Sequence, residues 1–203
     1  MRLALATVLL WALLGGVAQA CTRVAASNAA IDPGRIDQAR LSQAILGEVN
    51  FVRCQAGRRA VTAAPGTLIQ SATAHSVWMA QAGTLSHQGR GASGRGLADR
   101  VRSAGLRVRT AGENIAQLPR YTFGSQRFRV IDRGACVFQT RAGRQIPPHS
   151  YQSLARQVVA LWMASPGHRR NVLDPDVSAM GAGAAFSQSN TCGDYWVTQI
   201  FVG

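Results

Sequence analysis

The chain has 203 residues, 47% of them hydrophobic, and its 22 basic residues against nine acidic ones give a formal net charge of +13. This length and composition predict one globular domain with a sizeable core and exclude a disordered protein. All basic residues except the histidines are arginines, so a phosphate-loop lysine and a lysine Schiff base are excluded. The charge favours anionic partners such as lipid head groups or cell-wall polymers, although a surface that only keeps the protein soluble explains it equally well. No run of five arginines occurs, so nucleic acid is not expected as a partner.

Residues 1–20 have the pattern of a secretory signal peptide. Arg2 is followed by an apolar run, Leu3 to Leu14, and by the cleavage pattern Ala18-Gln19-Ala20. The apolar run is too short to span a bilayer, and no later stretch is long enough. We therefore expect an exported protein, periplasmic or extracellular, that begins at Cys21. Lipidation of Cys21 is the less favoured alternative, because Gln19 fits a lipobox poorly.

The chain contains four cysteines, which in an exported protein predict two disulfides. Three pairings are possible from the sequence. We favour Cys21 with Cys54, which would tie the N-terminal arm to the first helix, and Cys136 with Cys192, which would tie an insertion to the last strands.

Hydrophobic periodicity and turn residues predict an α+β domain over residues 36–203, preceded by a flexible arm at 21–35. Pro166 and Gly167 are expected to end the last helix. No internal repeat is visible. Helices are expected at about 36–53, 67–82, 97–104 and 153–164, and strands at 106–110, 179–187 and 195–202, with a hairpin at 128–140 inside an insertion at about 117–150.

Four side chains are informative by type and place. His75 falls in an apolar helical stripe and is interpreted as a buried core histidine, whereas His87 follows the helix in a polar loop and suits a ligand or proton carrier. Glu48 is interpreted as a surface charge. Glu113 stands between glycine and asparagine at a strand edge, where it could face a cleft. On the residues alone, an ordinary loop histidine and a turn carboxylate are the alternatives.

The segment 89–94 matches the glycine pattern of dinucleotide-binding loops. A predicted helix precedes it where the pattern needs a strand, so no nucleotide cofactor is expected.

Five short motifs occur together in one order. They are Leu85-Ser86-His87, Gly112-Glu113-Asn114-Ile115-Ala116, Ser165-Pro166-Gly167-His168-Arg169-Arg170-Asn171-Val172-Leu173, Met180-Gly181-Ala182-Gly183 and Tyr195-Trp196-Val197-Thr198-Gln199-Ile200-Phe201. In that order the chain resembles the bacterial branch of the CAP superfamily, secreted domains that include cysteine-rich secretory proteins, antigen-5 and pathogenesis-related-1 proteins. The resemblance covers about Leu41 to the C-terminus and implies a three-layer α-β-α sandwich with a small antiparallel sheet.

The resemblance also implies a cleft lined by two histidines and two acids. His87, Glu113 and His168 match three of these positions, with Ser165 and Arg169 beside them. The second acid has no counterpart, because Ser165 stands where it is expected. Two imidazoles and one carboxylate could bind Zn²⁺ or another divalent ion.

Three functions are compatible with these residues. The favoured one is an exported, monomeric binding module that holds a lipid or cell-envelope ligand in the cleft, with a divalent metal as an optional component. The alternative is a metal-dependent, peptidase-like hydrolase that uses His87, Glu113 and His168. The third is a non-catalytic interaction protein that works through its basic surface.

Overall fold

A computed structural model describes residues 21–188 and 192–203. The predicted signal peptide lies outside the described residues. Among the described helices, none is long and apolar enough to cross a membrane. The helices are α1 (Gln38–Gln55), α2 (Gly66–Ala82), α3 (Leu97–Ser103), α4 (Tyr151–Ala164) and α5 (Pro166–Leu173), with a 3₁₀ turn at Gly91–Ser93; the strands are β1 (Thr62–Ala63), β2 (Ala111–Pro119), β3 (Phe128–Asp132), β4 (Val137–Thr140), β5 (Ala179–Ser187) and β6 (Asp194–Val202).

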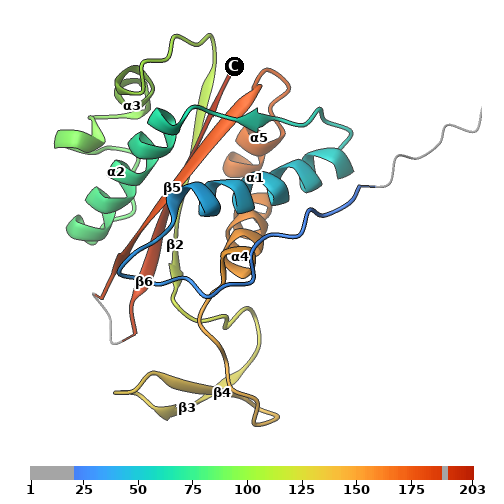
Figure 1. Ribbon diagram of the computed structural model, residues 1–203, viewed down its shortest axis with the longest axis vertical. Coiled ribbons are helices and arrows are strands. Elements are labelled where there is room, and N and C mark those ends of the chain that lie inside the picture. The colour runs from blue at the N-terminus through green and yellow to red at the C-terminus, as the bar shows by residue number, and fades with distance from the viewer. Residues whose placement is uncertain (1–20, 189–191) are drawn as a thin grey trace, which may run out of the picture.

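The main sheet has the strand order β1-β5-β6-β2, so β2 is an edge strand. The pairs β5 with β6 and β6 with β2 are antiparallel, and the short β1 lies parallel to β5. Helices α2 and α3 cover one face of the sheet, and α1, α4 and α5 cover the other (Figure 1). This confirms the predicted three-layer α+β fold. The hairpin of β3 and β4 is a separate two-stranded sheet that projects from one end of the body (Figure 1).

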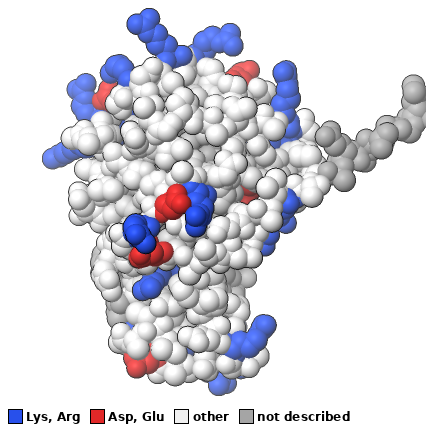
Figure 2. Space-filling model, viewed as in Figure 1, with Lys and Arg blue, Asp and Glu red and all other residues white. Residues whose placement is uncertain are grey.

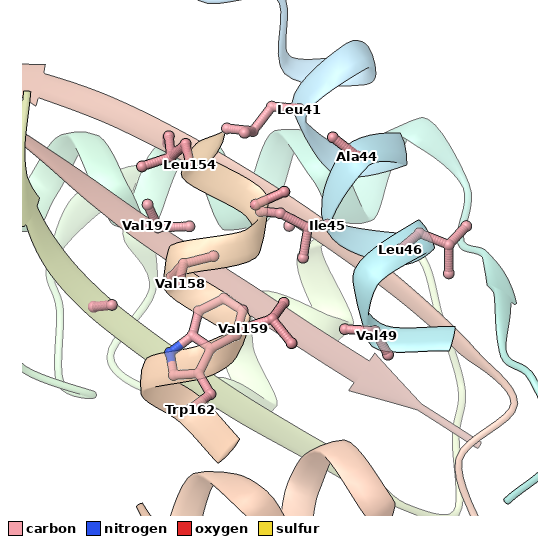
Figure 3. Close-up of a cluster of buried hydrophobic side chains, with 14 of the residues drawn as sticks. Leu41, Ala44, Ile45, Leu46, Val49, Leu154, Val158, Val159, Trp162 and Val197 are labelled. Carbon is pink, nitrogen blue, oxygen red and sulfur yellow. The ribbon is translucent and has the colours of Figure 1, made fainter. Parts of the chain in front are cut away.

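The main core lies between α1, α4 and the sheet. Side chains of α1 such as Ile45 and Val49 meet Val158 and Val159 of α4 (Figure 3), and all four are buried. Trp162 fills the space near the edge strand, and its indole Nε1 donates a hydrogen bond of 3.1 Å to the carbonyl of Ile115. The apolar spacing of the two helices therefore serves one shared core.

The Met180-Gly181-Ala182-Gly183 motif brings α2 close to the sheet. Met180, Ala182 and Ala184 point into the main core, so the two glycines that alternate with them face α2. A Cβ on Gly183 would lie 2.5 Å from the backbone nitrogen of Thr73 and would also meet the Thr73 hydroxyl. Glycine is therefore required here by the close approach of the helix backbone.

The two disulfides join Cys21 to Cys54 and Cys136 to Cys192, the pairing favoured from the sequence. In the Cys21–Cys54 disulfide the sulfur of Cys21 is bonded to Cys54, so it is not available for lipidation. The arm that we expected to be flexible is held against α1 and the start of α4. Ile31 is buried, and its backbone nitrogen donates to the carbonyl of His149 at 3.0 Å.

Three predictions about local structure were wrong. The strand expected at 106–110 begins at Ala111 and runs to Pro119, so it includes Glu113. Helix α4 does end at Ala164, just before Pro166, as expected, but it is not the last helix. Pro166 begins α5, because proline is well tolerated in the first turn of a helix, where its missing N–H is not needed. Glu48 is buried, with its two carboxylate oxygens held by Arg23 at 2.9 Å and Arg156 at 3.2 Å.

The close packing at Gly183 can be tested by Gly183→Ala. We expect the free energy of unfolding in urea to fall by about 1 to 3 kcal/mol, because the added methyl group must displace α2. Gly66→Ala in the first turn of α2, where a Cβ meets nothing within 4 Å, is the matched control. The control should be neutral or slightly stabilising, and equal effects of the two changes would contradict the packing argument.

Candidate functional site

Glu113 is the centre of the candidate site and lies near the start of the edge strand β2. Alternation along this strand sends Glu113 and Ile115 toward the α2 and α3 layer, whereas Gly112 and Asn114 face α5. Glu113 is buried, with 2% of its side chain exposed. A carboxylate at such depth requires compensating charge and hydrogen bonds.

Arg100 of α3 supplies that compensation. Its Nε donates to Oε2 of Glu113 at 2.6 Å and its Nη2 donates to Oε1 at 2.7 Å, a two-pronged ion pair between two buried side chains. The same guanidinium donates to the carbonyls of His87 at 2.7 Å and Ser93 at 3.0 Å. Arg100 therefore holds both Glu113 and the loop that carries His87.

His87 reaches the same carboxylate from the loop after α2. Its Nδ1 lies 2.8 Å from Oε1 of Glu113 and donates to it, while 53% of the side chain is exposed. Donation from Nδ1 leaves Nε2 of a neutral imidazole with a lone pair for a ligand or a proton. The loop histidine predicted as a site residue is thus joined to the predicted acid.

His75 lies behind this pair and is fully buried. Its Nε2 donates to the carbonyl of Ser86 at 2.9 Å, its Nδ1 accepts from the Ser93 hydroxyl at 2.8 Å, and its ring stacks on Trp78. Both ring nitrogens are used within the protein. His75 is a core histidine that supports the loop, as its place in the apolar stripe indicates.

His168 approaches from the opposite layer, in the first turn of α5. Its backbone carbonyl accepts from Nδ2 of Asn114 at 3.3 Å, and Asn171 donates to the Glu113 carbonyl at 3.0 Å. A Cβ on Gly112 would lie 3.1 Å from Asn171, so this glycine lets α5 lie against β2. The motif Gly112-Glu113-Asn114 therefore joins both helical layers to one strand.

The electrostatics of the site follow from this burial. Burial alone would raise the pKa of Glu113, but the hydrogen bonds from His87 and Arg100 and the charge of Arg100 outweigh it, and the pKa is lowered. Burial, followed by the charge of Arg100, lowers the pKa of His75. Burial also lowers the pKa of His168, and the nearby charge of His87 adds to this effect. Both effects disfavour the protonated form of His168.

These contacts bear directly on the metal that the resemblance implies. Both oxygens of Glu113 already accept hydrogen bonds from Arg100. The Nδ1 of His87 donates to the same carboxylate and is therefore not free to bind a metal ion. Among residues 21–188 and 192–203, no group of three or more His, Cys, Asp or Glu side chains is arranged to hold a metal ion. The three-ligand set considered from the sequence does not fit this geometry.

Two further predicted cleft residues have other partners. Ser165 is the residue between α4 and α5, and its carbonyl accepts from the backbone nitrogen of Arg169 at 2.8 Å. The Arg169 side chain turns back to the end of α4, where Nε donates to the Met163 carbonyl at 2.6 Å. Neither side chain is held by Glu113 or the two site histidines.

Sequence reasoning missed Arg100. The signal was present, because Arg100 stands between Leu97, Val101 and Ala104 on the apolar side of a short helix. A charged residue within such a stripe needs a buried partner, and Glu113 is the acid that lies within reach.

A three-layer α-β-α domain with one histidine from each helical layer at an edge strand has the form of a CAP-type domain. The model of the cysteine-rich secretory protein family, CAP, matches residues 46–201. The chain belongs to this family.

Bacterial proteins of known sequence or structure are similar to the chain. It is 30% identical over 105 residues to the uncharacterized protein YkwD of Bacillus subtilis, a match that covers 52% of the chain but only 26% of YkwD. An extracellular SCP-domain protein of Bacillus anthracis superposes with a TM-score of 0.53 at 20% identity, over 81% of this chain and 41% of that one. An outer surface protein of Borrelia burgdorferi superposes with a TM-score of 0.52 at 14% identity, over 82% of this chain and 96% of that one. These structures share the fold.

The buried ion pair predicts that replacing Glu113 by glutamine lowers the stability of the fold more than the same change at Glu48. In Glu113→Gln, Arg100 keeps its buried charge without a counter-charge, so we expect about 3 to 5 kcal/mol less stability to urea at neutral pH. Glu48→Gln is the matched control, because its arginine partners are about half exposed and can regain water. We expect it to cost about 1 kcal/mol or less.

The pH dependence of stability provides a second measurement on the same variants. Glu113 has a lowered pKa in the folded state, so its contribution is complete above the ordinary carboxyl value of 4.5 and is lost as pH falls toward the folded value. Below pH 4.5 the wild type should therefore lose stability more steeply than Glu113→Gln. Parallel curves for the two proteins would contradict the assignment.

Proposed function

We propose that this CAP-family protein is an exported binding module for an anionic, partly apolar component of the cell envelope. The observation that carries the proposal is a groove of about 840 Å³ between α3 and the segment that leads into β2. Its apolar lining includes Leu97, Val101, Leu106 and Val108. The volume is in the range of sites that hold small molecules.

Charge around the groove supports an anionic ligand. Arg102, Arg107 and Arg109 line it and are exposed. Figure 2 shows arginines gathered at this end of the molecule, over α3 and the segment after it. Guanidinium groups bind phosphate and carboxylate through paired hydrogen bonds, while the apolar wall favours a hydrocarbon chain. A lipid with an anionic head group satisfies both requirements.

The groove and the histidine cleft share α3 as a structural element. Arg100 points from α3 to Glu113, whereas Leu97, Val101 and Arg102 of the same helix line the groove. The groove lining does not include His87, Glu113 or His168. The proposal therefore places the apolar part of the ligand beside α3 and assigns the two site histidines to polar contacts at the adjacent edge of β2.

The hydrolase alternative has less support. In the described part of the chain, no serine, threonine or cysteine side chain is hydrogen-bonded to the ring of His87 or His168, and Glu113 is held by Arg100. If a divalent ion binds, Nε2 of His87 and the His168 ring are the groups left to hold it. Two imidazoles make a weaker site than the three or four ligands of zinc enzymes.

Lipid binding in the groove can be tested with a fluorescent fatty acid and with lysophosphatidylglycerol. Val108→Glu places a carboxylate in the apolar wall, and we expect affinity to fall at least about tenfold. Val24→Glu, at a residue that is 72% exposed and does not line this groove, is the matched control and should bind as the wild type does. Unchanged affinity of Val108→Glu would exclude the groove as the lipid site.

Metal binding can be measured by calorimetric titration of the oxidised protein with Zn²⁺ near neutral pH. We expect weak one-to-one binding that disappears in the double variant His87→Ala/His168→Ala, because each imidazole supplies one ligand. Ser165→Ala is the control. Tight binding, or binding retained in the double variant, would contradict the two-imidazole site.

A further inference from the structure

We propose that the β3–β4 hairpin is a docking surface for an anionic lipid bilayer. The hairpin projects from the body at the end opposite α3 (Figure 1). All five residues of β3 are exposed. This surface is separate from the groove and from the histidine cleft, so the inference does not depend on the function proposed for them.

Exposed apolar side chains are concentrated on this strand. Phe128, Val130 and Ile131 are 42%, 46% and 53% exposed. Phe128 stacks on Phe123 at 4.4 Å between ring centroids, and Phe138 packs edge-on against both rings. Phe128 and Val130 line a hollow of about 300 Å³ together with Phe123 and Phe138. Exposed apolar groups gathered in this way indicate an interaction surface.

Arginines are interleaved with these apolar residues. Arg127, Arg129 and Arg141 line an open hollow of about 700 Å³ together with Gln126 and Phe128. Within the described residues, no carboxylate lies within 4 Å of these three guanidinium groups. Asp132 is the only acid between residues 120 and 149, and its Oδ1 accepts from the backbone nitrogen of Ala135 in the turn. The hollow therefore has positive charge available for phosphate groups.

Exposed apolar side chains and unpaired arginines on one hairpin favour a lipid bilayer as the partner over a soluble polyanion or a protein strand. A soluble polyanion would use the arginines but would leave Phe128, Val130 and Ile131 in water. A protein strand could pair with the outer edge of β3, but the β-bulge between Val130 and Asp132 interrupts that edge. Apolar side chains beside arginines suit the boundary between lipid head groups and acyl chains, where the charge meets phosphate and the apolar groups leave water.

The hairpin is held firmly enough to dock without refolding. The disulfide Cys136–Cys192 ties it to the turn between β5 and β6. The other edge of β4 is covered by the returning chain, where the backbone nitrogen of Ile146 donates to the Phe138 carbonyl at 2.9 Å. Little conformational entropy is then lost on binding.

Co-sedimentation with vesicles tests the proposal, with the oxidised protein comprising residues 21–203. We expect binding to vesicles of phosphatidylcholine that contain phosphatidylglycerol and little binding to pure phosphatidylcholine. Arg127→Gln/Arg129→Gln/Arg141→Gln should weaken the partition about 10- to 100-fold, because each arginine near an anionic surface contributes several-fold. The control Arg58→Gln/Arg59→Gln/Arg90→Gln removes the same charge from other exposed positions and should lose much less.

A second pair of variants tests the apolar part. Val130→Ser/Ile131→Ser should weaken binding severalfold and make the remainder more sensitive to salt, whereas Val24→Ser/Val77→Ser, at exposed residues elsewhere, should not. If the hairpin variants and their controls lost vesicle binding equally, net charge alone would explain the attraction and the proposal would be overturned. The proposal would also be overturned if both hairpin variants bound vesicles as strongly as the wild type does. Val108→Glu should leave vesicle binding intact, so failure of the lipid groove and failure of the hairpin are distinguishable.

Discussion

The ion pair between Arg100 and Glu113 is the contact on which the arrangement of the candidate site depends. It joins α3 to the edge strand, and the remaining N–H groups of Arg100 bind the carbonyls of His87 and Ser93. The loop between α2 and α3 is thus shaped by a side chain from the helix that follows it. Since a guanidinium does not lose its proton near neutral pH, this support is present at any pH at which the carboxylate is ionised.

The other face of the same strand is held in a different way. Asn114, Asn171 and Gln199 form a chain of neutral hydrogen bonds that fixes α5 and with it His168. The edge strand β2 is therefore held by an ion pair on one face and by hydrogen bonds between side-chain amides on the other. The His87 ring and the backbone that carries His168 are consequently held in place before any ligand arrives. Such preorganisation reduces the cost of binding, because few side chains must be ordered afterwards.

Much of this fold could be predicted from sequence. The periodic apolar residues of α1, α2 and α4 and the apolar strands β5 and β6 indicated those elements directly. The misjudged features depend on contacts that are distant in sequence. Glu48 resembles a surface charge until Arg23 and Arg156 meet it, and the start of β2 is set by pairing with β6. The site was recognised from short motifs, whereas the role of Arg100 required knowing which helix faces Glu113.

The segment 120–149, which carries the hairpin, leaves and rejoins the body of the domain at one place. The backbone nitrogen of His149 donates to the carbonyl of Arg120 at 2.9 Å, and Tyr121 bridges Pro148 next to it. A segment whose ends already touch can be shortened, exchanged or replaced by a tight turn with little effect on loop closure. The disulfide limits such a replacement, because Cys192 lies in the body of the domain and has to be replaced together with Cys136. This segment can therefore be exchanged as a unit, and its surface changed, without altering the main sheet.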